Sequence, residues 1–268
     1  MSTLRAALFN VAFYIDTAII GVFGLPFLLM PRRTCMRHGR FWAQSVLFLL
    51  KWIVGLDSEI RGLDRVPPGG CLIAMKHQSM WDTLILPPLL GDPAVVIKRE
   101  LLYVPIYGWY AAHSGSIFID RKGGAGALRR MVAAAKRAIA AGRPVVIFPQ
   151  GTRTRPGLPV SEMPYHPGVA ALYRELGVPL VPAAVNSGLY WGRRAFVKRP
   201  GRIVLEFLAP IPPGRPRREV MTELEERIET TAAALEREAL AQCDFGVASM
   251  KSASASTTPG ASGNFGSK

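Results

Sequence analysis

Short apolar segments alternate with helical stretches along most of this 268-residue chain, and no other feature of the sequence restricts the fold as strongly. Six segments have the length and apolar composition of β-strands. They are residues 71–75, 94–97, 116–119, 145–148, 180–185 and 203–208. Because alternating strands and helices form sheets between helical layers, we expect an α/β domain over residues 57–245, with a mixed, largely parallel sheet covered by helices.

Three helices are expected between or after the later strands, at residues 126–141, 167–176 and 218–241. In each of them apolar residues recur every three or four positions, which places them on one face of a helix. The final segment, 246–268, is rich in Ser, Gly, Ala and Thr. Such a composition cannot bury enough apolar surface to fold, so we expect a disordered tail.

The N-terminal part has a different character. Residues 6–30 are almost continuously apolar, interrupted by Asp16, and are long enough to cross a bilayer as a helix. A second apolar segment, 41–56, is shorter and contains Lys51, and arginines lie in the loop expected between the two. The positive-inside rule puts such a loop on the cytoplasmic face. We expect residues 1–56 to be a membrane-anchoring helical hairpin, with the following domain on the cytoplasmic face of an inner or plasma membrane. The alternative is that 41–56 is a buried helix of that domain.

The chain is strongly basic, with 33 Lys and Arg against 19 Asp and Glu and a net charge of +14. This excess indicates either a solvated basic surface or an anionic partner. Because the apolar N-terminus supplies a second binding contribution, a membrane with anionic lipid is favoured over nucleic acid, for which no binding motif is visible. Three cysteines without a C-x-x-C pair indicate neither a disulfide framework nor a zinc site, and no cluster of metal ligands is visible.

The first candidate site follows the strand expected at 71–75. His77 comes directly after this strand, and Asp82 lies five residues later in what should be a new helix. A turn between them can bring the carboxylate to one imidazole nitrogen and leave the other free to take a proton, as a general base requires. No G-x-S-x-G nucleophile motif is present, so direct attack by an acceptor is favoured over a covalent acyl-enzyme.

Polar residues also follow other expected strands, where ligands bind in open α/β sheets. Arg121 ends the segment 115–121, and its guanidinium suits bidentate phosphate binding. The segment 148–155 opens into a loop that offers phosphate-binding groups, namely backbone N–H groups, the Thr152 hydroxyl and the guanidiniums of Arg153 and Arg155. The segment 178–185, which contains Pro179 and Pro182, reads as a strand with a proline at its start or edge.

In this order, the four segments resemble the glycerolipid acyltransferase family, specifically the 1-acylglycerol-3-phosphate acyltransferases. The family pattern is an N-H-x4-D block, then G-x-[IV]-F-I-[DN]-R, then F-P-E-G-[TS]-R-[ST], and then a [VI]-P-[IV]-[VI]-P strand. The resemblance runs from about residue 55 to residue 210. Each block alone is weak or moderate, whereas the ordered set is highly specific.

The resemblance implies roles for particular residues. His77 would deprotonate the acceptor hydroxyl, and Asp82 would orient the His77 imidazole. Arg121, Gly151 and Arg153, with Gln150 and Thr152 in the same loop, would hold the acceptor phosphate. Lys98 would assist there or near the thioester, and Pro182 would shape the acyl-binding region. Two positions depart from the pattern: Lys76 stands in place of the common Asn, and Gln150 in place of Glu, which removes a charge.

The implied reaction is transfer of a fatty acyl group from acyl-CoA or an acyl carrier protein to the sn-2 hydroxyl of 1-acylglycerol-3-phosphate, giving phosphatidic acid. The thioester is a co-substrate, and no cofactor or metal is required. Two alternatives remain open, namely acylation of another lysolipid such as a lyso-ornithine lipid, and a non-catalytic membrane protein that binds anionic lipid. The sequence leaves the acyl-chain preference, the donor and the oligomeric state open.

Overall fold

The computed structural model describes residues 2–121 and 123–255, with side chains described as far as residue 242. Its centre is a seven-stranded sheet in the order β1-β7-β6-β2-β5-β3-β4. The strands are β1 (Leu56–Arg61), β2 (Leu72–Met75), β3 (Ala94–Lys98), β4 (Ile117–Ile119), β5 (Val145–Ile147), β6 (Leu180–Val185) and β7 (Gly201–Phe207). All neighbouring strands pair in parallel except β6 and β7, which are antiparallel. The expected mixed, largely parallel sheet is confirmed.

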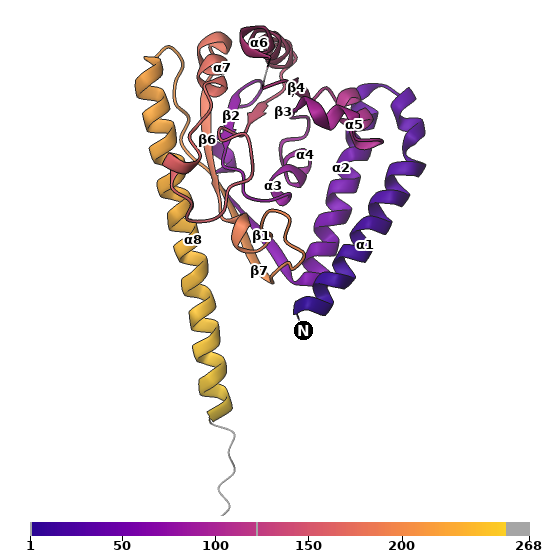
Figure 1. Ribbon diagram of the computed structural model, residues 1–268, viewed down its shortest axis with the longest axis vertical. Helices are drawn as coiled ribbons and strands as arrows, with labels where there is room; N and C mark the ends of the chain where they lie inside the picture. Colours follow the sequence, from indigo (N-terminus) through magenta and orange to yellow (C-terminus); the bar gives the residue numbers. More distant parts are fainter. Residues whose placement is uncertain (1, 122, 256–268) are drawn as a thin grey trace, which may run out of the picture.

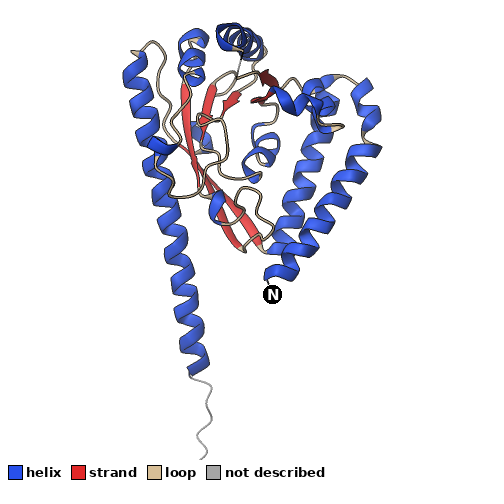
Figure 2. Ribbon diagram, in the orientation of Figure 1, coloured by secondary structure: helices blue, strands red, loops and turns tan. Residues whose placement is uncertain are grey.

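Helices cover both faces of the sheet (Figures 1 and 2). They are α1 (Ser2–Phe23), α2 (Arg32–Leu49), α3 (Trp81–Leu84), α4 (Leu86–Leu90), α5 (Tyr107–His113), α6 (Gly124–Ala140), α7 (Gly168–Leu176) and α8 (Arg217–Ala255). Successive side chains of a strand point to opposite faces. Thus Leu72 and Ala74 of β2 pack in a core with α6, α7 and α8, whereas Ile73 and Met75 pack in a second core with α2, α3 and α4.

The six expected strands are all present, with ends that differ by one or two residues at most. The sequence missed β1, which reads Leu-Asp-Ser-Glu-Ile-Arg and lies at an edge of the sheet. Only Leu56 of this strand is buried. An edge strand with mostly polar side chains lacks the apolar run by which the other strands were recognised.

The arginines expected in a loop between the two apolar segments lie instead in the first turns of helix α2. Pro31 precedes the helix, and the arginines from Arg32 onward form its first turns. The last turn widens into a π-helix at Leu50–Val54. Ala43, Val46, Leu50 and Val54 are buried in the same core as Ile73. One face of the segment 41–56 therefore belongs to the globular domain, although its opposite face stays exposed at Phe41, Phe48 and Trp52.

The helices α1 and α2 form a hairpin joined by polar contacts. The Ser45 hydroxyl donates to Asp16 Oδ1 at 2.7 Å, and Trp42 Nε1 donates to Thr17 Oγ1 at 3.1 Å. Most apolar side chains of α1 nevertheless face outward. Within the described residues, a single helix, Thr3–Phe23, is long and apolar enough to cross a membrane. This finding is consistent with membrane association.

The helix α8 runs along one side of the sheet and projects beyond it (Figure 1). It extends to Ala255, which lies within the range 246–268 where the composition predicts disorder. Residues 256–268 of that range lie outside the described residues. Near the sheet, Ala232 and Leu235 of α8 pack against Ala184 and Val204. This packing brings α8 next to the loops that follow the strands.

Candidate active site

The structure brings His77 and Asp82 into direct contact. The strand β2 ends at Met75, and α3 begins at Trp81, so the turn between them returns the chain toward His77. His77 Nδ1 lies 2.8 Å from Asp82 Oδ2. The imidazole stacks on Phe148, with ring centroids 4.1 Å apart. In the described part of the chain no hydrogen bond reaches Nε2, so the arrangement leaves this nitrogen for a substrate proton.

The Asp82 carboxylate is fully buried and fixed from three further directions. Its Oδ2 accepts the backbone N–H groups of Gln78 at 2.6 Å and Ser79 at 2.8 Å. Its Oδ1 accepts the Ser187 hydroxyl at 2.5 Å. A buried carboxylate needs such partners, because an unpaired one is costly to desolvate. The carboxylate therefore has one orientation, which in turn fixes the imidazole ring.

The loop after β5 (Val145–Ile147) is hydrogen-bonded to the backbone of His77. Thr154 donates to the His77 carbonyl oxygen twice, from its N–H at 2.8 Å and from its hydroxyl at 3.3 Å. Gly151 has φ +63°, and a Cβ there would lie 2.6 Å from Arg121 Nη2. Glycine adopts this left-handed backbone without strain, and its lack of a side chain leaves room for the guanidinium. The guanidinium of Arg121 donates to the Gly151 carbonyl, so this arginine and the loop lie together.

The same loop carries a partly desolvated arginine. Burial lowers the pKa of Arg153 from its ordinary value; Asp82 opposes this shift, whereas Arg193 and Arg194 add to it. Burial also lowers the pKa of Arg121. Both guanidiniums remain charged at neutral pH, because an arginine titrates far above it. The site thus gathers positive charge beside the His77–Asp82 pair, as an anionic substrate requires.

The remaining residues singled out from the sequence lie at different depths. Gln150 is buried, and its amide donates to the Met163 carbonyl at 3.1 Å, so it bonds within the loop. Thr152 is half-buried, and Lys98 is exposed at the end of β3. Pro182 is buried in the middle of β6, opposite Ala74, with β2 and β7 on its two sides. Pro179 directly precedes this strand, as expected of a proline at a strand start, whereas Pro182 lies in the strand interior.

Known proteins resemble this chain in sequence and in fold. Residues 57–186 match the family described as Acyltransferase. A 1-acyl-sn-glycerol-3-phosphate acyltransferase of Pseudomonas aeruginosa is 35% identical over 209 residues, which cover 76% of this chain and 80% of the relative. The chain belongs to the acyltransferase family.

Two further proteins share less sequence identity with this acyltransferase. A mouse 1-acyl-sn-glycerol-3-phosphate acyltransferase alpha is 32% identical over 170 residues, covering 62% of this chain and 59% of the relative. The crystal structure of a 1-acyl-sn-glycerophosphate acyltransferase from Thermotoga maritima superposes with a TM-score of 0.72 over 88% of this chain and 98% of that one. At 21% identity, this structural match bears on the fold alone.

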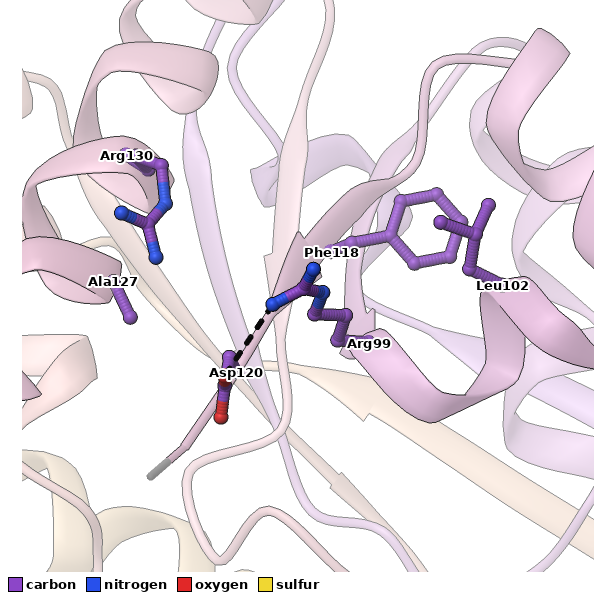
Figure 3. A pocket seen from close by; sticks show the side chains of 6 residues that line it. All are labelled: Arg99, Leu102, Phe118, Asp120, Ala127 and Arg130. Carbon is purple, nitrogen blue, oxygen red and sulfur yellow. Dashed lines mark ion pairs between the residues drawn. The ribbon is translucent and has the colours of Figure 1, made fainter. Parts of the chain in front are cut away.

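The acyltransferase also has an open cavity of about 540 Å³ (Figure 3). Its walls come from the short helix Arg99–Tyr103 after β3, from β4 and the residue that follows it, and from α6. They consist of Arg99, Leu102, Phe118, Asp120, Ala127 and Arg130. Arg99 Nη1 lies 3.5 Å from Asp120 Oδ2, while Figure 3 shows Arg130 on the opposite wall. Two guanidiniums against one carboxylate leave the cavity with net positive charge.

Sequence reasoning missed Ser187 and the arginines 193 and 194 in this acyltransferase. Ser187 follows the end of β6, so the rule that ligands gather at strand ends could have identified it. Arg193 and Arg194 lie in the long connection from β6 to β7, and nothing in their spacing connects them with Arg153. Among the described residues no group of His, Cys, Asp and Glu side chains has the composition and geometry of a metal site.

Proposed function

We propose that this acyltransferase moves a fatty acyl group from a thioester to the sn-2 hydroxyl of 1-acylglycerol-3-phosphate and so produces phosphatidic acid. The observation that carries the proposal is the oriented His77–Asp82 pair, which lies beside the loop that carries Arg153 and accepts a hydrogen bond from Arg121. A base next to phosphate-binding groups suits an acceptor that has both a hydroxyl and a phosphate. The names of the Pseudomonas and mouse relatives agree with this acceptor.

In the reaction, Nε2 of His77 takes the proton of the acceptor hydroxyl while its oxygen attacks the thioester carbonyl. The C–O bond forms and the carbonyl becomes a tetrahedral oxyanion. This intermediate collapses with cleavage of the C–S bond, and the imidazolium returns its proton to the leaving thiolate. Asp82 holds the ring in the tautomer that leaves Nε2 free, and it stabilises the positive charge while the proton is on the ring.

The acceptor phosphate is assigned to Arg121 and Arg153. Guanidiniums bind phosphate oxygens through paired N–H donors. Gly151 and Thr152 contribute the loop backbone and a hydroxyl to the same site. Gln150 supports the loop without binding the phosphate directly, because its buried amide donates to the Met163 carbonyl. A carboxylate at this position could not donate that hydrogen bond. Its substitution for the family's Glu therefore leaves the loop with a satisfied hydrogen bond.

The donor is acyl-CoA or an acyl carrier protein, both of which carry phosphate groups. Lys98 and the cavity between Arg99 and Arg130 lie at the β3–β4 edge of the sheet, to one side of His77. Three strand spacings separate β2 from β4, or about 14 Å at 4.8 Å per spacing. We assign the donor's phosphates to this edge, so that its acyl end can reach the base. Pro182 is assigned to the region that shapes acyl binding, through its place in the sheet.

The α1–α2 hairpin is assigned to a membrane with anionic lipid, with the catalytic domain on the cytoplasmic face. Apolar side chains on α1 and α2 are exposed on the same hairpin that Ser45 and Trp42 tie together. At the start of α2, Arg32 is paired with Asp92, whereas the exposed Arg33 and Arg37 lie toward the end of the hairpin, where they can meet anionic headgroups. Such a location gives the enzyme direct access to lipid acceptors.

The proposal is tested by acyl transfer with the purified full-length protein and a panel of acceptors: lysophosphatidic acid, monoacylglycerol and a lyso-ornithine lipid. Hydrogen bonds to charged groups contribute about 1.5–3 kcal/mol each, so Arg153→Ala should lower kcat/KM for lysophosphatidic acid by about 10- to 100-fold. The exposed neighbour Arg155 provides a matched control as Arg155→Ala. A wild-type preference for a phosphate-free lysolipid, or equal losses on lysophosphatidic acid and monoacylglycerol, would show the acceptor assignment to be wrong.

A further inference from the structure

Two glutamates of α8 contact the residues on either side of His77. The Lys76 side chain is only 3% exposed, and its ammonium forms an ion pair with Glu229 Oε2. The other oxygen, Glu229 Oε1, accepts the Tyr165 hydroxyl at 2.9 Å. A buried ammonium needs a charged partner, because its desolvation is otherwise costly. Lys76 is therefore held to α8.

The second contact involves Gln78, which is fully buried. Its Nε2 donates to Glu236 Oε1 at 2.7 Å, and its Oε1 accepts the Gly188 N–H at 3.0 Å. The remaining oxygen of the glutamate, Oε2, accepts the Gly157 N–H at 3.0 Å. Glu236 thus connects α8 with the loops that follow β2 and β5, and Gln78 connects the loop after β2 with the segment that follows β6.

The arrangement of these contacts follows from helix geometry. Glu229 and Glu236 are seven residues apart, which is two turns, so both lie on one face of α8. Lys76 and Gln78 flank His77 and both reach this face, whereas His77 itself stacks on Phe148. Figure 1 shows α8 running along the sheet beside β6. The helix therefore holds the side chains of both neighbours of His77.

We infer that Glu229 and Glu236 are positioning residues, which hold the segment 76–78 so that the His77 imidazole meets both Asp82 and the acceptor. The inference rests on the proposed function, since it gives His77 the base role. The Lys76–Glu229 ion pair requires a lysine at position 76, where the acyltransferase family commonly has asparagine. In this chain the C-terminal helix thus takes part in aligning the base.

A purely structural role predicts a different result from a positioning role. Loss of stability alone lowers the melting temperature and the active fraction, while the folded enzyme keeps its kcat. Loss of positioning lowers kcat in the folded enzyme and leaves KM for lysophosphatidic acid nearly unchanged, because the phosphate-binding arginines stay in place. The two residues of a pair that acts as a unit also give non-additive losses.

The test uses full-length Lys76→Met, Glu229→Gln and the double variant, with Glu226→Gln on the exposed side of α8 as control. Misplacement of a catalytic group by about 1 Å can cost about 10²-fold, so each single variant should lower kcat by about 10- to 100-fold. KM should change by less than about threefold, and the double variant should resemble the worse single variant. If a variant at Lys76 does not fold, Glu236→Ala gives the same test with the ion pair intact.

An unchanged kcat in folded variants, or losses that multiply in the double variant, would overturn the inference. Wild-type activity on the acceptor panel separates this outcome from failure of the proposed function. If wild type acylates lysophosphatidic acid and the α8 variants match the control, only the positioning role is wrong. If wild type does not acylate lysophosphatidic acid, the function is wrong, and the variants are then compared on whichever acceptor wild type uses.

Discussion

Asp82→Asn removes one charge from the site and keeps its shape. Three hydrogen bonds reach Asp82 Oδ2, from Nδ1 of His77 and from two backbone N–H groups, and one reaches Oδ1 from Ser187. An asparagine can place its carbonyl oxygen at the Oδ2 position. Its amide nitrogen then faces Ser187, whose hydroxyl can accept as well as donate. The imidazole therefore keeps its orientation, and what changes is the charge beside it.

The size of the effect follows from the charge that develops on His77. When the ring carries the substrate proton, a carboxylate about 4 Å from the centre of charge stabilises it by about 4 kcal/mol at an effective dielectric constant of about 20. The charge-assisted hydrogen bond adds about 1 kcal/mol over a neutral one. A loss of about 3–5 kcal/mol in the transition state lowers kcat by about 10²- to 10⁴-fold.

The assay is single-turnover acyl transfer to lysophosphatidic acid, with the melting temperature measured in parallel. Ser187→Ala is the matched control, because it removes the hydrogen bond to Oδ1 and leaves the carboxylate charge and three hydrogen bonds. It should cost less than about tenfold. If Asp82→Asn retains more than about a tenth of the wild-type rate, the carboxylate charge does not stabilise the proton transfer, and the mechanism above needs another source of that stabilisation.

Two further predictions concern other parts of the molecule. Burial raises the pKa of the Cys71 thiol to about 11, so at about pH 8 this thiol should be protonated and should resist iodoacetamide until the protein unfolds. Peptide mapping by mass spectrometry measures the alkylation of Cys71. Rapid alkylation of Cys71 in the native protein would contradict its burial next to β2. The exposed Leu8, Ile15 and Ile19 of α1 are predicted to enter the membrane, where each apolar side chain removed from water contributes about 1.5–3 kcal/mol. Replacing the three with glutamine should therefore reduce co-sedimentation of the protein with anionic vesicles. Unchanged co-sedimentation would exclude this face of α1 as the membrane contact.

Local contacts could be predicted from the sequence and distant ones could not. The His77–Asp82 contact spans five residues, and a strand end followed by a helix start was enough to predict it. Ser187 lies 105 residues from Asp82, and Glu229 lies 153 residues from Lys76. These partners depend on which strands are neighbours and on the course of α8, and single-sequence patterns contain neither. The sequence showed that Lys76 departs from the family pattern, but it could not show that Glu229 is its ion-pair partner.

The N-terminal segment shows a second limit of sequence reasoning. Length and apolar composition identified a hairpin, but they cannot separate a residue that faces lipid from one that faces a protein core. In the structure Phe9 and Val46 are fully buried, whereas Phe48 and Trp52 are exposed. Phe9 packs edge-on against Trp191 at 5.7 Å between ring centroids. Residues 1–56 therefore combine an exposed apolar surface with part of the folded core, so their removal would expose the interior of the catalytic domain.

The double hydrogen bond from Thr154 to the His77 carbonyl has a consequence for how such an enzyme can diversify. The loop that carries Arg153 and the segment that carries the base share one backbone connection, so an insertion or a bend in the loop displaces the base. Under the proposed function, acceptor specificity can then change freely only at side-chain tips, such as the guanidiniums of Arg121 and Arg153. Descendants that use other lysolipids should differ in those tips and in the neighbouring connection around Arg193, and should keep the length of the loop.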